Sequence, residues 1–147
     1  MSTNTETLGR FVYAQEHDYD QALTELISGH KQTHWIWYIL PQLRELGRSQ
    51  MALKYGISSR TEAKDYAAHP VLGPRLLECV NAILQNSNRS AKQILGDVDS
   101  MKFRSCLTLF AEVAPSEPIF NRALAAFYQG RRDTETLRLL GLESCDA

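Results

Sequence analysis

The sequence predicts a compact, all-α, single-domain bundle of about eight or nine mostly short helices, with little or no β structure. Apolar residues recur every three or four positions along most of the chain, which is the period of a helix that buries one face. Capping residues and glycines bracket many of these stretches. No alternating run bounded by hairpin turns and no internal repeat is present, so strands and repeat folds are not expected.

Two apolar stripes are expected near the N-terminus. The first is short and comprises Leu8, Phe11 and Val12. The second follows Asp18, whose carboxylate is suited to cap a helix start, and it ends at Gly29. Its apolar side chains recur on one face and are Tyr19, Ala22, Leu23, Leu26 and Ile27. We therefore expect a separate helix to begin at Asp18.

Residues 35–40 form the longest unbroken apolar run, and its periodicity alone does not separate a buried helix from a strand. Pro41 disfavours the α conformation at the residue before it. We favour a short buried helix, with an extended segment as the alternative. Ser49 then opens a further segment, and Ser59 with Glu62 has the spacing of a capping box. Both predict short helices.

The second half of the chain has the strongest helical patterns. We expect the central helix to be the one whose apolar face comprises Leu72, Leu76, Cys79, Val80 and Ile83. Ser90 and Gln93 repeat the capping-box pattern, and an Asp-rich turn then leads into a helix that should pack on the central one. Its apolar residues are Phe103, Cys106, Leu107, Phe110 and Val113. Pro118 and Asp133 mark the starts of the last two helices.

The 147 residues fit one domain, which we expect at 7–142 between mobile tails at 1–6 and 143–147. A formal net charge of -1 makes nucleic acid an unfavoured partner, because non-specific binding to phosphates depends on a cationic surface. The sequence lacks both an apolar run of about 20 residues and a secretory signal pattern, so we expect a cytoplasmic protein with no membrane partner. A monomer and a small homo-oligomer both remain open. Three cysteines without Cys-x-x-Cys spacing are expected to be reduced structural thiols.

A dense cluster of functional side chains comes directly after the second apolar stripe. Lys31, Trp35 and Trp37 are candidate ligand-binding residues there, although such aromatics more often pack in the core or at its rim. His34 is a catalytic candidate because imidazole moves protons near neutral pH, and a backbone contact at a helix start is its alternative role. His30 stands four residues before His34, but no acidic ligand accompanies the pair. We therefore expect no metal site and no cofactor.

Two helix starts supply further candidates. Lys102, Arg104 and Ser105 follow the Asp-rich turn, where free backbone N–H groups can hold an anion. His69 and Arg75 flank the entry to the central helix, as a second catalytic candidate and a further ligand-binding candidate. Helix caps, turn chemistry and solvated surface charges are the alternatives at both places. The sequence lacks the common nucleotide-loop, hydrolase-elbow and zinc motifs.

Several of these residues also carry a resemblance to a known family. The resemblance rests on Lys31, His34-Trp35-Ile36-Trp37, Pro41-Gln42-Leu43, Leu46-Gly47-Arg48-Ser49, His69-Pro70-Val71-Leu72-Gly73 and Lys102-Phe103-Arg104-Ser105-Cys106-Leu107. Over residues 11–141 the chain resembles the bacterial family DUF1810, which implies a compact all-α fold and brings no established activity. Some members carry the label calpastatin, and no residue here supports a protease-inhibitor role.

A looser likeness is to the helical NADAR proteins, some of which act on nucleotide-derived N-glycosides. It rests on an aromatic and glutamine segment, here residues 37–42, followed by a Ser-x-x-Ala stretch at 49–52. This likeness adds Gln42 to the candidate ligand-binding residues and implies a nucleotide-like ligand.

The sequence as a whole favours a helical domain with one pocket that gathers residues 34–42, the entry at 69–75 and the helix start at Lys102. In this hypothesis an indole stacks on a ring, Lys102 and Arg104 hold a phosphate, and an imidazole moves a proton. The ligand would be nucleotide-like or otherwise phosphorylated, and hydrolysis of an N-glycosidic bond is one candidate activity. Whether the chain is an enzyme stays open. The alternative is a non-enzymatic protein–protein interaction module.

Overall fold

The computed structural model describes residues 3–141, and side chains from Leu8 onward. Within that range the all-α prediction is confirmed, with nine α-helices, one 3-10 helix and one isolated parallel bridge between Leu43 and Ile57. The elements are α1 (Thr3–Ser28), α2 (Ile36–Ile39), η1 (Arg44–Leu46), α3 (Gln50–Tyr55), α4 (Arg60–Ala68), α5 (Leu72–Leu84), α6 (Ala91–Leu95), α7 (Asp97–Val113), α8 (Ile119–Tyr128) and α9 (Thr134–Leu139). Of the two expected tails, residues 1–2 and 143–147 lie outside the described residues, while 3–6 belong to α1. Mobility of both tails stays a prediction.

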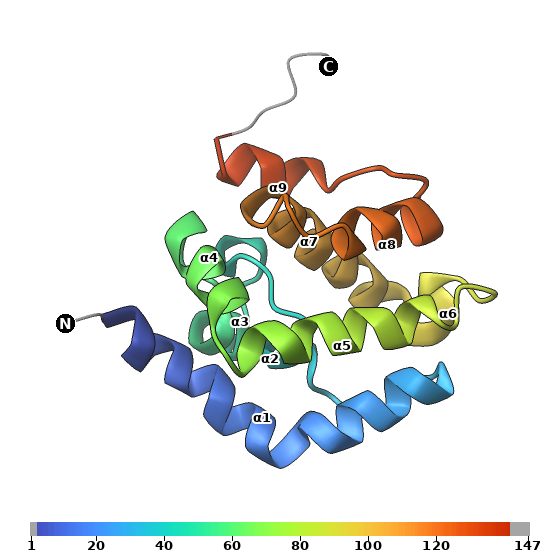
Figure 1. Ribbon diagram of the computed structural model, residues 1–147, viewed down its shortest axis with the longest axis horizontal. Coiled ribbons are helices and arrows are strands. Elements are labelled where there is room, and N and C mark those ends of the chain that lie inside the picture. The colour runs from blue at the N-terminus through green and yellow to red at the C-terminus, as the bar shows by residue number, and fades with distance from the viewer. Residues whose placement is uncertain (1–2, 142–147) are drawn as a thin grey trace.

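Helix α5 runs through the middle of the bundle, with α1 along one side and α7, α8 and α9 on the other (Figure 1). It packs against α1, α4 and α8. The main helix partners of α7 are α4, α6, α8 and α9. Its backbone lies farther from α5 than expected, and the two helices share the hydrophobic core through their side chains. None of the helices in residues 3–141 has the combined length and apolar character that a membrane crossing requires.

The core is built on the predicted apolar face of α5. Its five side chains are all buried, and they meet buried aromatic rings from α1, α4, α7 and α8: Phe11, Tyr66, Phe103, Phe110 and Phe120. Cys79 and Cys106 are buried free thiols, and burial raises the pKa of Cys79 to about 12. Both fit the expected structural role, and Cys145 lies outside the described residues.

The N-terminal stripes belong to one 26-residue helix, so the prediction of a new helix at Asp18 is wrong. Asp18 lies inside α1, where its carboxylate accepts a hydrogen bond from the Tyr38 hydroxyl. The gap between the stripes is filled by Gln15, which is 1% exposed and donates to the Tyr38 carbonyl (2.7 Å) and the Tyr66 hydroxyl (3.0 Å). Ile27, expected on the buried face, is 62% exposed, because it lies on the opposite side of the helix from the fully buried Ala22.

Residues 35–40 are all buried, and the short helix favoured for them is α2. Leu40 closes this helix in a non-helical conformation (φ -126°, ψ 71°), as its position before Pro41 requires. Gln42 follows shortly after this buried run and lines a pocket that is described below.

Residues 44–56 form an excursion whose two ends are joined by backbone hydrogen bonds. The Arg44 N–H donates to the Ile57 carbonyl (2.9 Å), and the Ile57 N–H donates to the Gln42 carbonyl (2.9 Å). The excursion contains η1 and α3, and Gly47 lies so close to the Trp37 indole that an added Cβ would be 2.6 Å from a ring carbon. This contact fixes the 44–56 excursion against α2.

Candidate functional site

Two adjoining pockets lie between α2, the 44–56 excursion and the start of α7. The larger, here called pocket A, has a volume of about 430 Å³ and reaches Asp133 and Glu135 at the start of α9. The smaller, pocket B, has a volume of about 300 Å³ and extends toward the loop before α2. Both are lined by Trp37, Ser49 and Lys102, so these three side chains form their common boundary.

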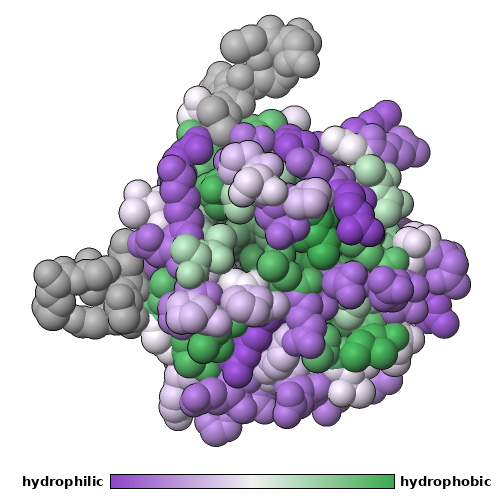
Figure 2. Space-filling model, in the orientation of Figure 1, coloured by the Kyte–Doolittle hydropathy of each residue, from purple (hydrophilic) through white to green (hydrophobic). Residues whose placement is uncertain are grey.

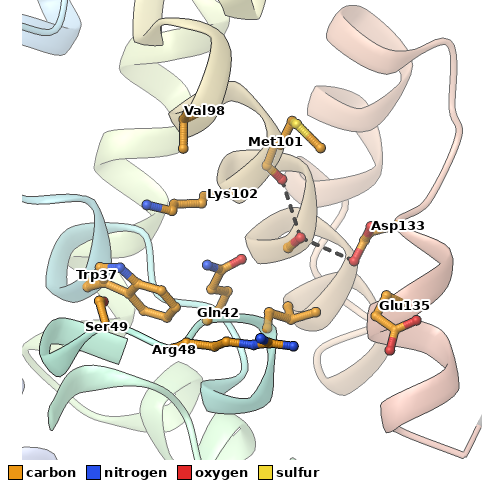
Figure 3. A pocket seen from close by; sticks show the side chains of 12 residues that line it. Trp37, Gln42, Arg48, Ser49, Val98, Met101, Lys102, Asp133 and Glu135 are labelled. Atoms are coloured by element: carbon orange, nitrogen blue, oxygen red, sulfur yellow. Dashed lines mark hydrogen bonds between the residues drawn. The ribbon is translucent and has the colours of Figure 1, made fainter. Parts of the chain in front are cut away.

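Gln42 supplies the polar floor of pocket A. The residue is only 3% exposed, and its backbone is fixed by the bond to Ile57. Its carboxamide nevertheless makes no hydrogen bond to any residue that the structure describes. Figure 3 shows this side chain in the middle of the pocket, between Lys102 and Arg48. Its amide atoms are open to the pocket, so both its N–H donors and its oxygen acceptor are available to a ligand.

Lys102 differs from Lys31, the other lysine at this site. The Lys31 ammonium lies 2.9 Å from Asp99 Oδ2 and 4.9 Å from the Trp35 ring centre, and its side chain is only 6% exposed. The Lys102 ammonium lies 3.6 Å from Asp99 Oδ1 and 5.5 Å from the Trp37 ring centre, with 27% exposure. The Lys31 ammonium is thus buried and paired with Asp99, whereas the more exposed Lys102 ammonium has N–H donors available for a ligand.

The remaining charged groups of pocket A stand on opposite sides. Arg48 is exposed and forms no ion pair with another described residue. Asp133 and Glu135 lie on the side away from Trp37 (Figure 3). Asp133 Oδ2 accepts from the Ser105 hydroxyl (3.1 Å), so this hydroxyl is oriented by the start of α9. Figure 3 shows the Arg48 guanidinium directed from the 44–56 excursion toward the side of the pocket where these carboxylates lie, while Lys102 lies nearer Trp37.

Glu25 anchors the loop that forms the wall of pocket B. It is 4% exposed, and its Oε1 accepts from the Trp35 indole N–H (2.9 Å) and the backbone N–H groups of Gln32 (2.8 Å) and Thr33 (3.1 Å). Burial opposes ionisation, but hydrogen bonds from Gln21, Thr33 and Gln32 outweigh it and lower the pKa of Glu25 to about 2. Glu25 is thus an ionised structural residue.

The entry to α5 does not contribute to either pocket. The His69 imidazole accepts hydrogen bonds through Nδ1 from the backbone N–H groups of Val71 (3.1 Å) and Leu72 (3.2 Å), so it caps the first turn of α5. Arg75 donates to Gln15 (3.3 Å) and lies over the Tyr19 ring. The expected gathering of these two residues with Lys102 is therefore not seen.

Arg104 is likewise committed elsewhere, because its guanidinium donates to the carbonyls of Arg131 and Arg132 (both 2.8 Å). His34 is exposed and lines pocket B. The structure brings together seven of the candidates around the two pockets: Lys31, His34, Trp35, Trp37, Gln42, Lys102 and Ser105.

Sequence reasoning missed Arg48, Asp99 and Glu135 as residues of the site. Arg48 and Glu135 resemble ordinary surface charges, and no spacing rule points to either one. Ser49 and Asp133 were expected only as helix caps, which they are, and they line pocket A as well. Residues 3–141 contain no group of three or more His, Cys, Asp or Glu side chains placed to bind a metal ion.

A family model described as "Protein of unknown function (DUF1810)" matches residues 5–140 of the chain. Among solved structures, the fold is similar to the crystal structure of the conserved hypothetical protein Rv1873 from Mycobacterium tuberculosis. The two chains are 45% identical and superimpose with a TM-score of 0.89 over 91% of this chain and 96% of that chain. No curated protein matches the sequence.

Proposed function

The chain belongs to the DUF1810 family of unknown function, and we propose from its own geometry that it binds a small anionic ligand in pocket A. The observation that carries this proposal is the carboxamide of Gln42, a residue only 3% exposed, which faces the pocket without a partner among the described residues. Its amide atoms reach the solvent of the pocket, so a ligand can pair with them by displacing water.

The ligand class is indicated by the groups around Gln42. Lys102 and Arg48 provide positive charge that suits a phosphate or a carboxylate. The carboxamide offers a donor and an acceptor side by side, which matches an amide or the edge of a nucleobase. A volume of about 430 Å³ lies in the range of small-molecule sites. A nucleotide-like phosphate ester meets these requirements.

Hydrolysis of an N-glycosidic bond is the enzymatic form of this proposal, and it rests on His34 alone. His69 caps α5, so His34 is the one catalytic candidate that lines a pocket. Under this form, His34→Ala would abolish release of the free base from a nucleotide while ligand affinity is retained.

The alternative of a protein–protein interaction module is supported by one observation, the exposed apolar side chains of Val98 (65%) and Met101 (72%) beside pocket A. On the face seen in Figure 2, hydrophobic residues lie in separate patches divided by hydrophilic ones, so that face offers no broad apolar surface to a partner. A small ligand therefore explains Gln42 better than a protein partner does.

The test uses the two tryptophans of the chain as reporters. Adenosine 5′-monophosphate or inorganic phosphate, each at millimolar concentration, should shift the NMR signal of the Trp37 indole N–H, because Trp37 lines pocket A. Lys102→Met should remove the response, whereas the matched variant Lys92→Met, at a side chain 70% exposed, should retain it.

Gln42→Leu provides the second arm of the test. Leucine fills a similar volume without an unpaired amide, so the variant should be at least as stable as the parent while binding at least about tenfold more weakly. The proposal would be refuted if neither probe shifts the Trp37 signal, or if the Gln42→Leu variant binds the probes as tightly as the parent does.

A further inference from the structure

The two pockets are arranged on either side of one cation. Lys102 lines both, together with Trp37 and Ser49, and each pocket extends away from this boundary in its own direction. Pocket A leads toward α9, and pocket B leads toward the loop before α2. A ligand whose anionic group pairs with Lys102 therefore has room on both sides of that group.

The distribution of charge places the anion at this boundary. The far side of pocket A carries the carboxylates of Asp133 and Glu135, which would repel a phosphate placed there. In pocket B the buried ammonium of Lys31 is already matched by Asp99 at 2.9 Å. Lys102, whose contact with Asp99 is longer at 3.6 Å, is the cation at the boundary with capacity left for an external anion, whereas Arg48 lines pocket A alone.

The two pockets differ in the groups they present. Pocket A offers the Gln42 carboxamide and the oriented Ser105 hydroxyl, which suit an arm with hydrogen-bond donors and acceptors. Pocket B is bordered by Met51, which is 38% exposed, and by the exposed imidazole of His34. A thioether and an imidazole suit the face of a ring or another flat group.

We infer that the ligand is a two-armed molecule whose anionic group is internal, a phosphodiester or diphosphate linkage at Lys102 with one arm in pocket A and the other in pocket B. This inference rests on the proposed function and goes beyond it by predicting that ligands ending in their phosphate bind more weakly than two-armed ligands. Such ligands fill one pocket only and leave the other without a binding contribution.

The test compares probes that share a nucleoside and differ in whether a second group is attached to the terminal phosphate. Adenosine 5′-diphosphate is compared with diadenosine 5′,5′-diphosphate, and uridine 5′-diphosphate with uridine 5′-diphosphoglucose, by isothermal titration calorimetry on the full chain. Each pair keeps two phosphates and one nucleoside. The second arm replaces an ionisable oxygen of the terminal phosphate, so the two-armed probe carries about one negative charge fewer, and a gain in affinity comes from the arm and not from added charge. In at least one pair, the two-armed probe should bind about tenfold or more tightly, because only it contacts both pockets.

A substitution that fills pocket B tests this inference without testing the proposed function, because the proposed ligand-binding site is pocket A. Met51→Trp should remove the advantage of the two-armed probe and leave the one-armed probe unchanged. Leu53→Trp is the matched control, because Leu53 lies on the same helix, is 63% exposed and lines neither pocket. It should retain the advantage.

Equal affinities within both pairs, or an advantage that survives Met51→Trp, would overturn the two-armed ligand and leave the proposed function standing. Absence of binding by all four probes would count against the proposed function, and the inference would fall with it.

Discussion

Replacing Glu25 by glutamine should lower the unfolding free energy by about 3 kcal/mol more at pH 7 than near pH 2. The pKa of this carboxyl falls from an ordinary value of 4.5 to about 2 in the folded chain. A lowered pKa means that the ionised group stabilises the fold above pH 4.5, and that this contribution is lost as the pH falls toward 2. At about 1.4 kcal/mol for each pH unit between the two values, the loss amounts to about 3 kcal/mol.

The assay is urea unfolding followed by far-ultraviolet circular dichroism between pH 2 and pH 7. Glutamine keeps one oxygen to accept from the Trp35 indole but places an amide nitrogen where Oε2 accepts from Gln21 and Thr33. The change in the cost of the substitution between pH 7 and pH 2, and not the cost at one pH, therefore isolates the charge. Glu16→Gln, at an exposed carboxylate on the same helix, is the control and should change the unfolding free energy by less than about 0.5 kcal/mol. If Glu25→Gln costs the same at pH 7 as at pH 2, the hydrogen-bonded charge is not the source of the stability.

Two further predictions concern the walls of the pockets. Gly47→Ala should lower the unfolding free energy by about 1–3 kcal/mol, because its Cβ would lie 2.6 Å from the Trp37 ring. In the same denaturation assay Gly9→Ala, where nothing lies within 4 Å, should raise it by about 0.5–1 kcal/mol, and equal effects would contradict the packing argument. Asp99→Asn should tighten binding of adenosine 5′-monophosphate about two- to fivefold in calorimetry, because the carboxylate competes for Lys102. Weaker binding would instead mean that Asp99 positions the lysine.

The helical architecture could be predicted from the sequence because it depends on local signals. The capping box at Ser90 and Gln93, the Ser caps of α3 and α4 and the apolar face of α5 are all present as expected. The boundary at Asp18 failed because Gln15 interrupts the apolar pattern without interrupting the helix. Its carboxamide is buried against partners 23 and 51 residues away, which no local pattern reveals.

The candidate site was predictable in part, for the same physical reason. His34, Trp37 and Gln42 are clustered in the sequence, and they line the pockets together with Lys102 from a distant helix start. His69 and Arg104 have side chains of the same types as the pocket residues, but their hydrogen bonds stabilise the fold. His69 caps the start of α5, and Arg104 donates to carbonyls 27 and 28 residues later. Residue type shows what a side chain can bind, whereas only the tertiary fold shows which partners it already has.

The closed ends of the 44–56 excursion have a consequence for how this fold can diversify. Because backbone bonds at Arg44 and Ile57 join the two ends, a change in length between them adds little loop-closure entropy and leaves the helices that carry the core in place. The same excursion brings Arg48 and Ser49 to pocket A. Exchanges at its exposed positions offer a direct route to altered ligand preference, whereas Gly47, Ala52 and Tyr55 pack against the rest of the protein and would be kept. A library confined to the exposed positions would explore new specificities on an unchanged scaffold.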